Sequence, residues 1–310
     1  MKHLFIVNPV AGGLKGRPEE LAREIQMLAE ELNEPFEIYY TKGSMDATAK
    51  IKSEAESETD MLRVYACGGD GTLNECANGA ANRANVAITH YPCGTGNDFI
   101  RTFGTENIKK FRDLRELING TVRALDLIDC AGRYGINICS VGVDARIGSD
   151  VHKYSRIPII GGATGYVVSL IANMIKGVSQ YFRLNTEGFK LDEKISLACA
   201  CNGRFYGGGF NPVPDALPDD GKLDFLVVRR VSRLRFIQIV GRYAKGKART
   251  LGDIIAYSQG ECLEIEGDRE FVVNIDGEII HTEKISFKVV PGGVNFIFPS
   301  GLDFFNSRTQ

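Results

Sequence analysis

A short glycine-rich segment with one carboxylate, residues 68–72, has the sequence Gly-Gly-Asp-Gly-Thr and follows a mostly apolar stretch at 62–66. The stretch is predicted to be a strand, and residues 72–83 are predicted to be the helix after it. Glycines at this turn let main-chain N–H groups approach phosphate oxygens, and a helix start adds partial positive charge. Asp70 could then hold Mg²⁺, or a water on Mg²⁺, against the same phosphates. The same sequence also suits a tight strand-to-helix turn with Asp70 as the N-cap, so both interpretations stay open here.

A second polar glycine loop, residues 92–99, has the sequence Pro-Cys-Gly-Thr-Gly-Asn-Asp-Phe and follows a predicted strand at 86–91. Two such loops on one sheet edge indicate an anionic ligand. Asn97 and Asp98 are also good helix caps, and we expect one of them to cap the helix that contains Ile100 and Phe103. Neither a P-loop nor a dinucleotide fingerprint is present, so phosphate binding would need this different design.

Strands and helices are predicted to alternate through the first 125 residues. Apolar runs or alternating apolar residues predict strands at 4–7, 36–41, 62–66 and 86–91, and helical spacing predicts helices at 18–32, 44–56, 72–83 and 108–118. This alternation is typical of a doubly wound parallel sheet, whose ligands lie beyond the carboxyl ends of the strands. Loops 8–16, 41–45, 68–72 and 92–98 all leave that edge.

Short strands separated by Gly, Asp and Pro turns are predicted after residue 125. They lie at 125–130, 134–141, 181–185, 195–201, 223–228, 262–265, 271–275, 285–290 and 294–298. Such a series suggests a β-sandwich or barrel. Two helices are predicted to interrupt it, at 163–175 and 232–244. Segment 229–249 carries eight basic residues and no acidic residue.

Composition excludes several classes of protein. The 310 residues are 44% hydrophobic, enough for two domains, and the net charge of −2 argues against nucleic acid as the main partner. No apolar run approaches the roughly 20 residues that a membrane-spanning helix needs, and no signal-peptide pattern follows Met1, so we expect a cytoplasmic protein. Eight cysteines without C-x-x-C pairs, with four histidines, predict neither a disulfide framework nor a zinc site.

Three motifs at 8–13, 68–75 and 92–99, in this order and spacing, resemble the diacylglycerol kinase catalytic domain. The chain is most similar to the soluble bacterial lipid kinases, which are related to sphingosine kinases and more distantly to NAD kinases and phosphofructokinases. The resemblance covers nearly the whole chain. It implies a doubly wound nucleotide-binding domain at 1–125, to which the tail 299–310 can return, and a β-sandwich domain at 126–298 that binds the acceptor lipid. The predicted helix 163–175 would then either flank an acyl-chain pocket or pack between domains, or it is a plain core helix.

The resemblance also implies the site residues. ATP would bind to Asn8, Pro9, Val10, Ala11, Gly12, Thr41, Cys67, Gly68, Gly69, Asp70, Gly71, Thr72 and Thr95. Glu278 would be the catalytic base that acts with Asp70, although residues 276–278 read alone predict an ordinary hairpin turn. A structural Mg²⁺ would be held by Asp220 with the carbonyls of Leu217 and Lys222. The alternatives to that site are Asp219 as the ligand, or a polar turn without metal.

The implied activity is transfer of the γ-phosphoryl group of ATP to a lipid hydroxyl, most simply that of diacylglycerol, to give phosphatidic acid. A NAD kinase-like phosphotransferase and a non-catalytic nucleotide-binding regulator are the alternatives. A lipid acceptor implies transient peripheral contact with a membrane, and segment 229–249 either lies on an anionic bilayer or packs on the sandwich with a solvated basic face. An exposed sheet edge would allow two subunits to pair as a homodimer. The sequence does not determine which lipid alcohol is the acceptor.

Overall fold

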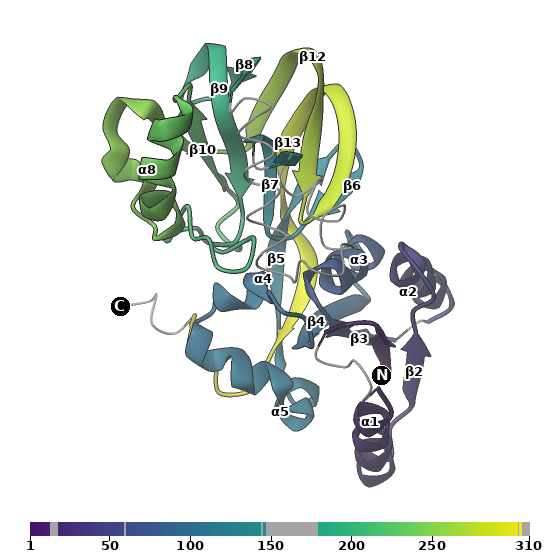
Figure 1. The fold of residues 1–310 in the computed structure, drawn as a ribbon. Coiled ribbons are helices and arrows are strands. Elements are labelled where there is room, and N and C mark those ends of the chain that lie inside the picture. Colours follow the sequence, from purple (N-terminus) through teal and green to yellow (C-terminus); the bar gives the residue numbers. More distant parts are fainter. Residues whose placement is uncertain (13–17, 59, 144, 147–178, 303, 306–310) are drawn as a thin grey trace. The chain divides into compact units, whose positions relative to one another are not determined.

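The computed structural model describes residues 1–12, 18–58, 60–143, 145–146, 179–302 and 304–305. The helix expected at 163–175 lies outside the described residues. The chain divides into two compact units (Figure 1): unit 1 comprises Met1–Leu127 and Pro291–Gln310, and unit 2 comprises Ile128–Val290. Both boundaries fall inside strands, β5 (Thr121–Cys130) and β13 (Glu278–Phe298). Within the described residues, no helix is long and apolar enough to cross a bilayer.

Unit 1 is built on a parallel sheet in the order β2-β1-β3-β4-β13. Its first four strands are β1 (Lys2–Val7), β2 (Phe36–Tyr40), β3 (Leu62–Gly68) and β4 (Val86–Pro92). The strands end at one edge, because Val7 pairs with both Tyr40 and Cys67, and Gly68 pairs with Pro92. β3 is buried along its whole length, including Arg63, whose guanidinium donates to the carbonyls of Leu117 and Gly120.

The helices of unit 1 follow the expected series with two differences. They are α1 (Pro18–Leu32), α2 (Asp46–Ser57), α3 (Asp70–Ala80), α4 (Asp98–Arg101), the 3₁₀ segment η1 (Thr105–Arg112) and α5 (Leu114–Ile118). The third helix begins at Asp70 instead of residue 72. The helix expected at 108–118 is divided, because the Asp113 side chain accepts from the N–H groups of Arg115 and Glu116 and so begins a new helix.

The end of β13 and the tail after it belong to unit 1, whereas the sequence places 126–298 in the second domain. Phe296 pairs in parallel with Ile88, and the Gly292 N–H donates to Asp126 at 2.8 Å. The tail packs on the same unit, since the ring centroid of Phe304 lies 5.1 Å from that of Phe103. The described tail residues Phe304 and Phe305 thus contact side chains of unit 1.

Unit 2 is mainly antiparallel. It contains β6 (Arg133–Gly135), β7 (Ile138–Gly142), β8 (Gln180–Asn185), β9 (Lys190–Cys201), β10 (Leu223–Arg229), α8 (Arg233–Ala244), η2 (Ala248–Ile254), β11 (Ile255–Gly260) and β12 (Cys262–Ile275), with the first part of β13. β11 was not expected, because its half-polar sequence lacks a strand pattern. The pairs expected at 262–265 and 271–275, and at 285–290 and 294–298, are each one strand. β12 shifts register between Glu266 and Phe271.

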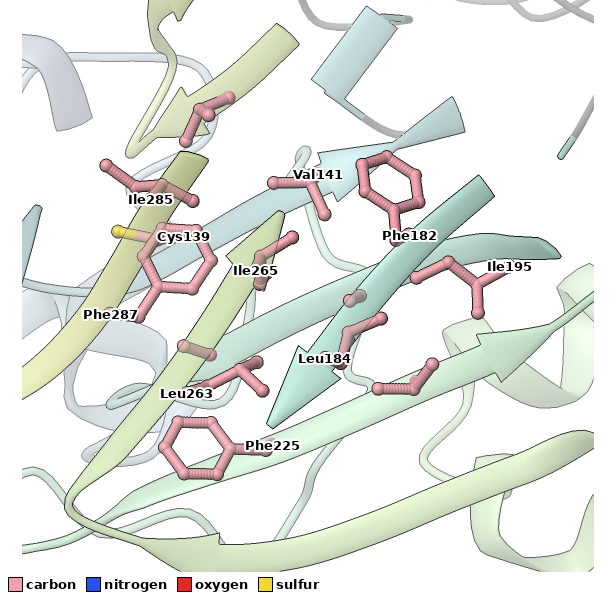
Figure 2. Close-up of a cluster of buried hydrophobic side chains, with 14 of the residues drawn as sticks. Cys139, Val141, Phe182, Leu184, Ile195, Phe225, Leu263, Ile265, Ile285 and Phe287 are labelled. Carbon is pink, nitrogen blue, oxygen red and sulfur yellow. The ribbon is translucent and has the colours of Figure 1, made fainter. Parts of the chain in front are cut away.

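Two apolar cores flank β9 and β10 because alternate side chains point to opposite faces. Ala198, Ala200, Phe225 and Val227 belong to one core, to which β8, β12 and β13 contribute Leu184, Leu263, Ile265 and Phe287 (Figure 2). The intervening residues Leu197, Cys199, Cys201, Leu226 and Val228 belong to the second core, beneath α8 and η2. Both faces of this part of the sheet are therefore covered.

Candidate functional site

Four loops that the sequence predicts to leave the same sheet edge converge in unit 1. The Asn8 side-chain amide donates to the Thr72 hydroxyl at 3.2 Å, which connects the loop after β1 to the start of α3. A Cβ on Gly12 would lie 3.4 Å from the Thr95 methyl group, so the loop after β4 lies alongside the loop after β1. Thr41 begins the loop after β2, and its N–H donates to the Val7 carbonyl at 3.0 Å. The sheet therefore brings these four segments together.

Glycines serve two different purposes in these loops. A Cβ on Gly94 would lie 2.5 Å from the Cα of Gly69, so this pair allows the two loops to pack against each other. Gly71 differs, since a Cβ there would have no heavy atom within 4 Å. Packing does not explain Gly71. Its position in the first turn of α3, where N–H groups lack helical partners, suits the close approach of an anion.

Asp70 is not the N-cap of α3, and that interpretation of the sequence is wrong. Gly69 is the N-cap, with no side-chain capping bond, and Asp70 is the first helical residue. The Asp70 carboxylate instead accepts from the Asp98 main-chain N–H at 2.7 Å. One of the two residues expected to cap the next helix, Asn97, does occupy the N-cap position of α4, but its side chain makes no capping hydrogen bond. The Asp70 carboxylate, from a different loop, accepts a hydrogen bond from the first turn of α4 instead.

The environment of Asp70 suits a cation beside phosphate. Its Oδ1 accepts the hydrogen bond from the Asp98 N–H. Its Oδ2 lies against Gly96, where a Cβ would be only 2.7 Å from this oxygen, so a glycine at 96 leaves room for the carboxylate. Burial raises the pKa of Asp70 above its usual value, although main-chain N–H groups of Asp98, Phe99 and Asn97 act in the opposite direction. A nearby Mg²⁺ would favour the ionised form. A half-buried carboxylate among glycine-exposed N–H groups thus fits a Mg²⁺-bound phosphate chain.

The other expected ATP-binding residues differ in what they can offer a ligand. Val10 is 81% exposed, whereas Ala11 is buried. Cys67 is fully buried within β3, and its carbonyl already accepts from the Asn8 N–H at 3.0 Å. Cys67 therefore helps to position the loop after β1 through its carbonyl, and its buried thiol does not face a ligand.

His90 is a residue of this region that sequence reasoning missed. It lies fully buried in β4, and its Nε2 is 3.1 Å from the Gly68 carbonyl, which also accepts from the N–H groups of Cys93 and Gly94. Burial lowers the pKa of His90 to about 4, so the ring is neutral and Nε2–H donates. His90 therefore fixes the carbonyl at the start of the glycine loop. A histidine within a mostly apolar strand was the available signal.

The segment 276–278 in unit 2 forms the hairpin turn that its sequence predicts. Asp276 and Gly277 have φ values of 50° and 100°, which is typical of a two-residue type I′ turn between β12 and β13. The Asp276 carboxylate accepts from the N–H groups of Ile136 and Ile138 at 2.6 and 2.8 Å. These bonds interrupt the strand expected at 134–141 and divide it into β6 and β7.

Glu278 begins β13 directly after this turn. Its carboxylate lies 3.2 Å from the Arg133 guanidinium, an ion pair that sequence reasoning missed because β6 is distant in the chain. The Glu278 side chain is 37% exposed and the Arg133 side chain 27% exposed. The turn therefore holds a carboxylate that solvent or a substrate can reach.

The segment expected to bind a structural Mg²⁺ is a polar turn before β10. Asp220 Oδ1 accepts from the Lys222 N–H at 3.1 Å. Asp220 and Lys222 are exposed, and Leu217 is half-buried. The donors are all oxygen atoms, as Mg²⁺ prefers. No cluster of three or more His, Cys, Asp or Glu side chains with metal-binding geometry occurs among the described residues.

Comparisons with known proteins cover both units. Residues 2–130 match the diacylglycerol kinase catalytic domain, and residues 137–298 match the YegS C-terminal NAD kinase beta sandwich-like domain. A YegS-like lipid kinase from Shewanella frigidimarina is 28% identical over 86% of each chain. A diacylglycerol kinase from Bacillus subtilis is 27% identical over 90% of each chain. The crystal structure of a diacylglycerol kinase from Bacillus anthracis is similar with a TM-score of 0.70 and 25% identity, over 97% of this chain and 98% of that one.

Proposed function

The chain belongs to the lipid kinase family that combines these two domains, and we propose that it transfers the γ-phosphoryl group of ATP to the hydroxyl group of diacylglycerol. The observation that carries the proposal is the convergence of the glycine loops around Asp70, with Gly71 open to a ligand. An anion with several phosphates fits main-chain N–H groups at a helix start. The β-sandwich-like unit would bind the acceptor.

The proposed reaction needs one general base, which accepts the proton of the attacking hydroxyl group. The Glu278 carboxylate accepts the proton of the lipid hydroxyl while the hydroxyl oxygen forms a bond to the γ-phosphorus. The bond from the γ-phosphorus to the bridging β–γ oxygen breaks, and its electron pair leaves with ADP. Such a base contributes typically 10²–10⁴-fold to the rate. Most of the remaining acceleration comes from positioning and from neutralising charge on the phosphates.

The residues of unit 1 have separate tasks in this proposal. The N–H groups at 70–72 hold phosphate oxygens, and the parallel sheet is used in the doubly wound manner of NAD kinases and phosphofructokinases. Asp70 would hold Mg²⁺, which when bound neutralises phosphate charge. A second, structural Mg²⁺ would bind Asp220 with the carbonyls of Leu217 and Lys222. The protein would act in the cytoplasm with reversible membrane contact, as a monomer or a homodimer.

A transfer screen with labelled ATP tests the function. We expect label to move to diacylglycerol in mixed micelles, and not to NAD. Glu278→Gln should lower kcat by at least a hundredfold, because the amide cannot accept the proton. The matched control is Glu283→Gln on the same strand, where the side chain is exposed and activity should not change.

Two results would reject the proposal. Transfer to NAD without transfer to any lipid alcohol would make the protein a NAD kinase-like phosphotransferase. ATP binding without transfer to any acceptor would make it a nucleotide-binding regulator. Transfer to a different lipid alcohol, with the same loss in Glu278→Gln, would correct the acceptor and leave the reaction in place.

A further inference from the structure

Helix α8 packs on unit 2 through one face only. Phe236, Ile239 and Tyr243 point toward the core beneath α8 and η2, and Ile239 and Tyr243 are nearly fully buried. At about 100° per residue, Leu234 points roughly 170° away from the mean direction of these three side chains. The helix is thus held firmly by its inner face, and its outer face is available for another task.

The outer face carries large apolar side chains that solvent reaches. Leu234 is 75% exposed and Ile237 is 56% exposed. They are the only exposed large hydrophobic side chains among the described residues of Ile128–Val290. A single exposed apolar side chain is ordinary on a protein surface. Two of them close together, on a helix whose opposite face is already buried, need an explanation.

The charge around this apolar pair has one sign. At the two ends of the segment, Arg229 pairs with Glu193 and Arg249 pairs with Asp215. Six basic residues lie between them, and five of these have no ion pair within the part of the chain that the structure describes: Arg230, Arg235, Arg242, Lys245 and Lys247. A hollow of about 350 Å³ at the start of the helix is lined by Lys194, Arg230 and Arg233 among others. The surface can therefore accept several negative charges at once.

We propose that this outer face of α8 docks the protein on an anionic lipid bilayer, with Leu234 and Ile237 inserted among the headgroups and the basic side chains on lipid phosphates. An interfacial helix needs an apolar strip and flanking cations, and both are present. Nucleic acid would use the cations but leave the two apolar side chains in water, and the chain as a whole is slightly acidic. The inference rests on the proposed lipid acceptor for its purpose, but docking can be measured without catalysis.

Flotation of the full-length protein with vesicles tests this surface. We expect binding to vesicles rich in phosphatidylglycerol at least tenfold tighter than to vesicles of phosphatidylcholine alone, with most of the difference lost in about 0.5 M salt. Leu234→Ser/Ile237→Ser should weaken binding to anionic vesicles by about tenfold or more. Arg235→Gln/Arg242→Gln should weaken it similarly and reduce the dependence on salt.

Matched controls separate docking from general surface changes. Met27→Ser/Leu32→Ser removes two exposed apolar side chains from α1, and Arg23→Gln/Lys52→Gln removes two exposed cations from unit 1. Both controls should bind vesicles like the parent, and circular dichroism should confirm that every variant is folded.

Three outcomes would overturn the inference: equal binding of the parent to both vesicle types, unchanged binding in the α8 variants, or an equal loss in the controls. The proposed function is tested separately with a short-chain diacylglycerol dispersed as monomers. The α8 variants should phosphorylate it like the parent. Failure of the parent to phosphorylate any lipid would reject the kinase proposal and leave the docking result standing.

Discussion

The Asp70 carboxylate accepts a hydrogen bond from the main-chain N–H of Asp98 at 2.7 Å, across two loops that follow neighbouring strands. One side chain therefore does two things: it begins α4 and it presents a charge beside the glycine loops. Separating these two roles needs a substitution that keeps the acceptor and removes the charge. Asparagine satisfies both conditions.

Asp70→Asn should keep the fold and lose phosphoryl transfer. Burial raises the pKa of Asp70, so the ionised form costs folding free energy at neutral pH, and the neutral amide should melt at the same or a higher temperature. The amide cannot hold Mg²⁺ as a carboxylate does, and kcat should fall by on the order of a hundredfold or more. Thermal unfolding and labelled-ATP transfer measure the two effects.

Asp113→Asn is the matched control, because Asp113 caps α5 in the same unit and asparagine is an equally good cap. Its activity should stay at the parental value. Parental transfer rates in Asp70→Asn would show that the charge at residue 70 has no part in the reaction.

The sequence predicts elements better than it predicts contacts. The sequence predicts the strands of unit 1 because apolar runs, such as the continuous run at 4–7, mark buried parallel strands. The bond from Asp98 to Asp70 could not be predicted, because it depends on β3 and β4 being neighbours. The ion pair between Arg133 and Glu278 could not be predicted either, because it also joins residues that are far apart in the chain. The half-polar strand β11 was missed because its burial comes from its place beside β10, which local sequence does not encode.

Gly71→Ala and Gly94→Ala should have opposite effects on stability. The new methyl group at 71 meets no neighbour within 4 Å, and alanine should stabilise α3 by about 0.5–1 kcal/mol. The methyl group at 94 would lie 2.5 Å from the Cα of Gly69 and should cost about 1–3 kcal/mol. Chemical denaturation of both variants measures these changes.

Nucleotide titration of Gly71→Ala then tests the site itself. If phosphate approaches the main chain at residue 71, the methyl group should weaken ATP binding by about tenfold or more although the protein is more stable. Unchanged affinity for ATP would mean that the phosphates lie elsewhere.

Asp276→Ala should destabilise unit 2, in contrast to Glu278→Gln. Loss of the Asp276 carboxylate leaves the N–H groups of Ile136 and Ile138 without their acceptor in a buried segment, at a cost of about 1–3 kcal/mol. Glu278→Gln keeps the turn and should unfold at the parental urea concentration while losing activity. Identical urea midpoints for Asp276→Ala and the parent would show that the turn does not depend on this carboxylate.

His90 should make folding stability depend on pH below about 6.5. Its pKa is lowered from 6.5 to about 4 by burial, so above pH 6.5 neither state binds the proton and stability is complete. As the pH falls below 6.5, His90 binds a proton in the unfolded chain but stays neutral in the native protein until the pH approaches 4. By linkage the native state loses about 2 kcal/mol at pH 5, and about 3 kcal/mol once the pH reaches the folded pKa.

His90→Gln can still donate to the Gly68 carbonyl but does not titrate. The free energy of unfolding of this variant should therefore fall less than that of the parent between pH 7 and pH 5, and parallel curves would contradict the assignment of a neutral buried ring.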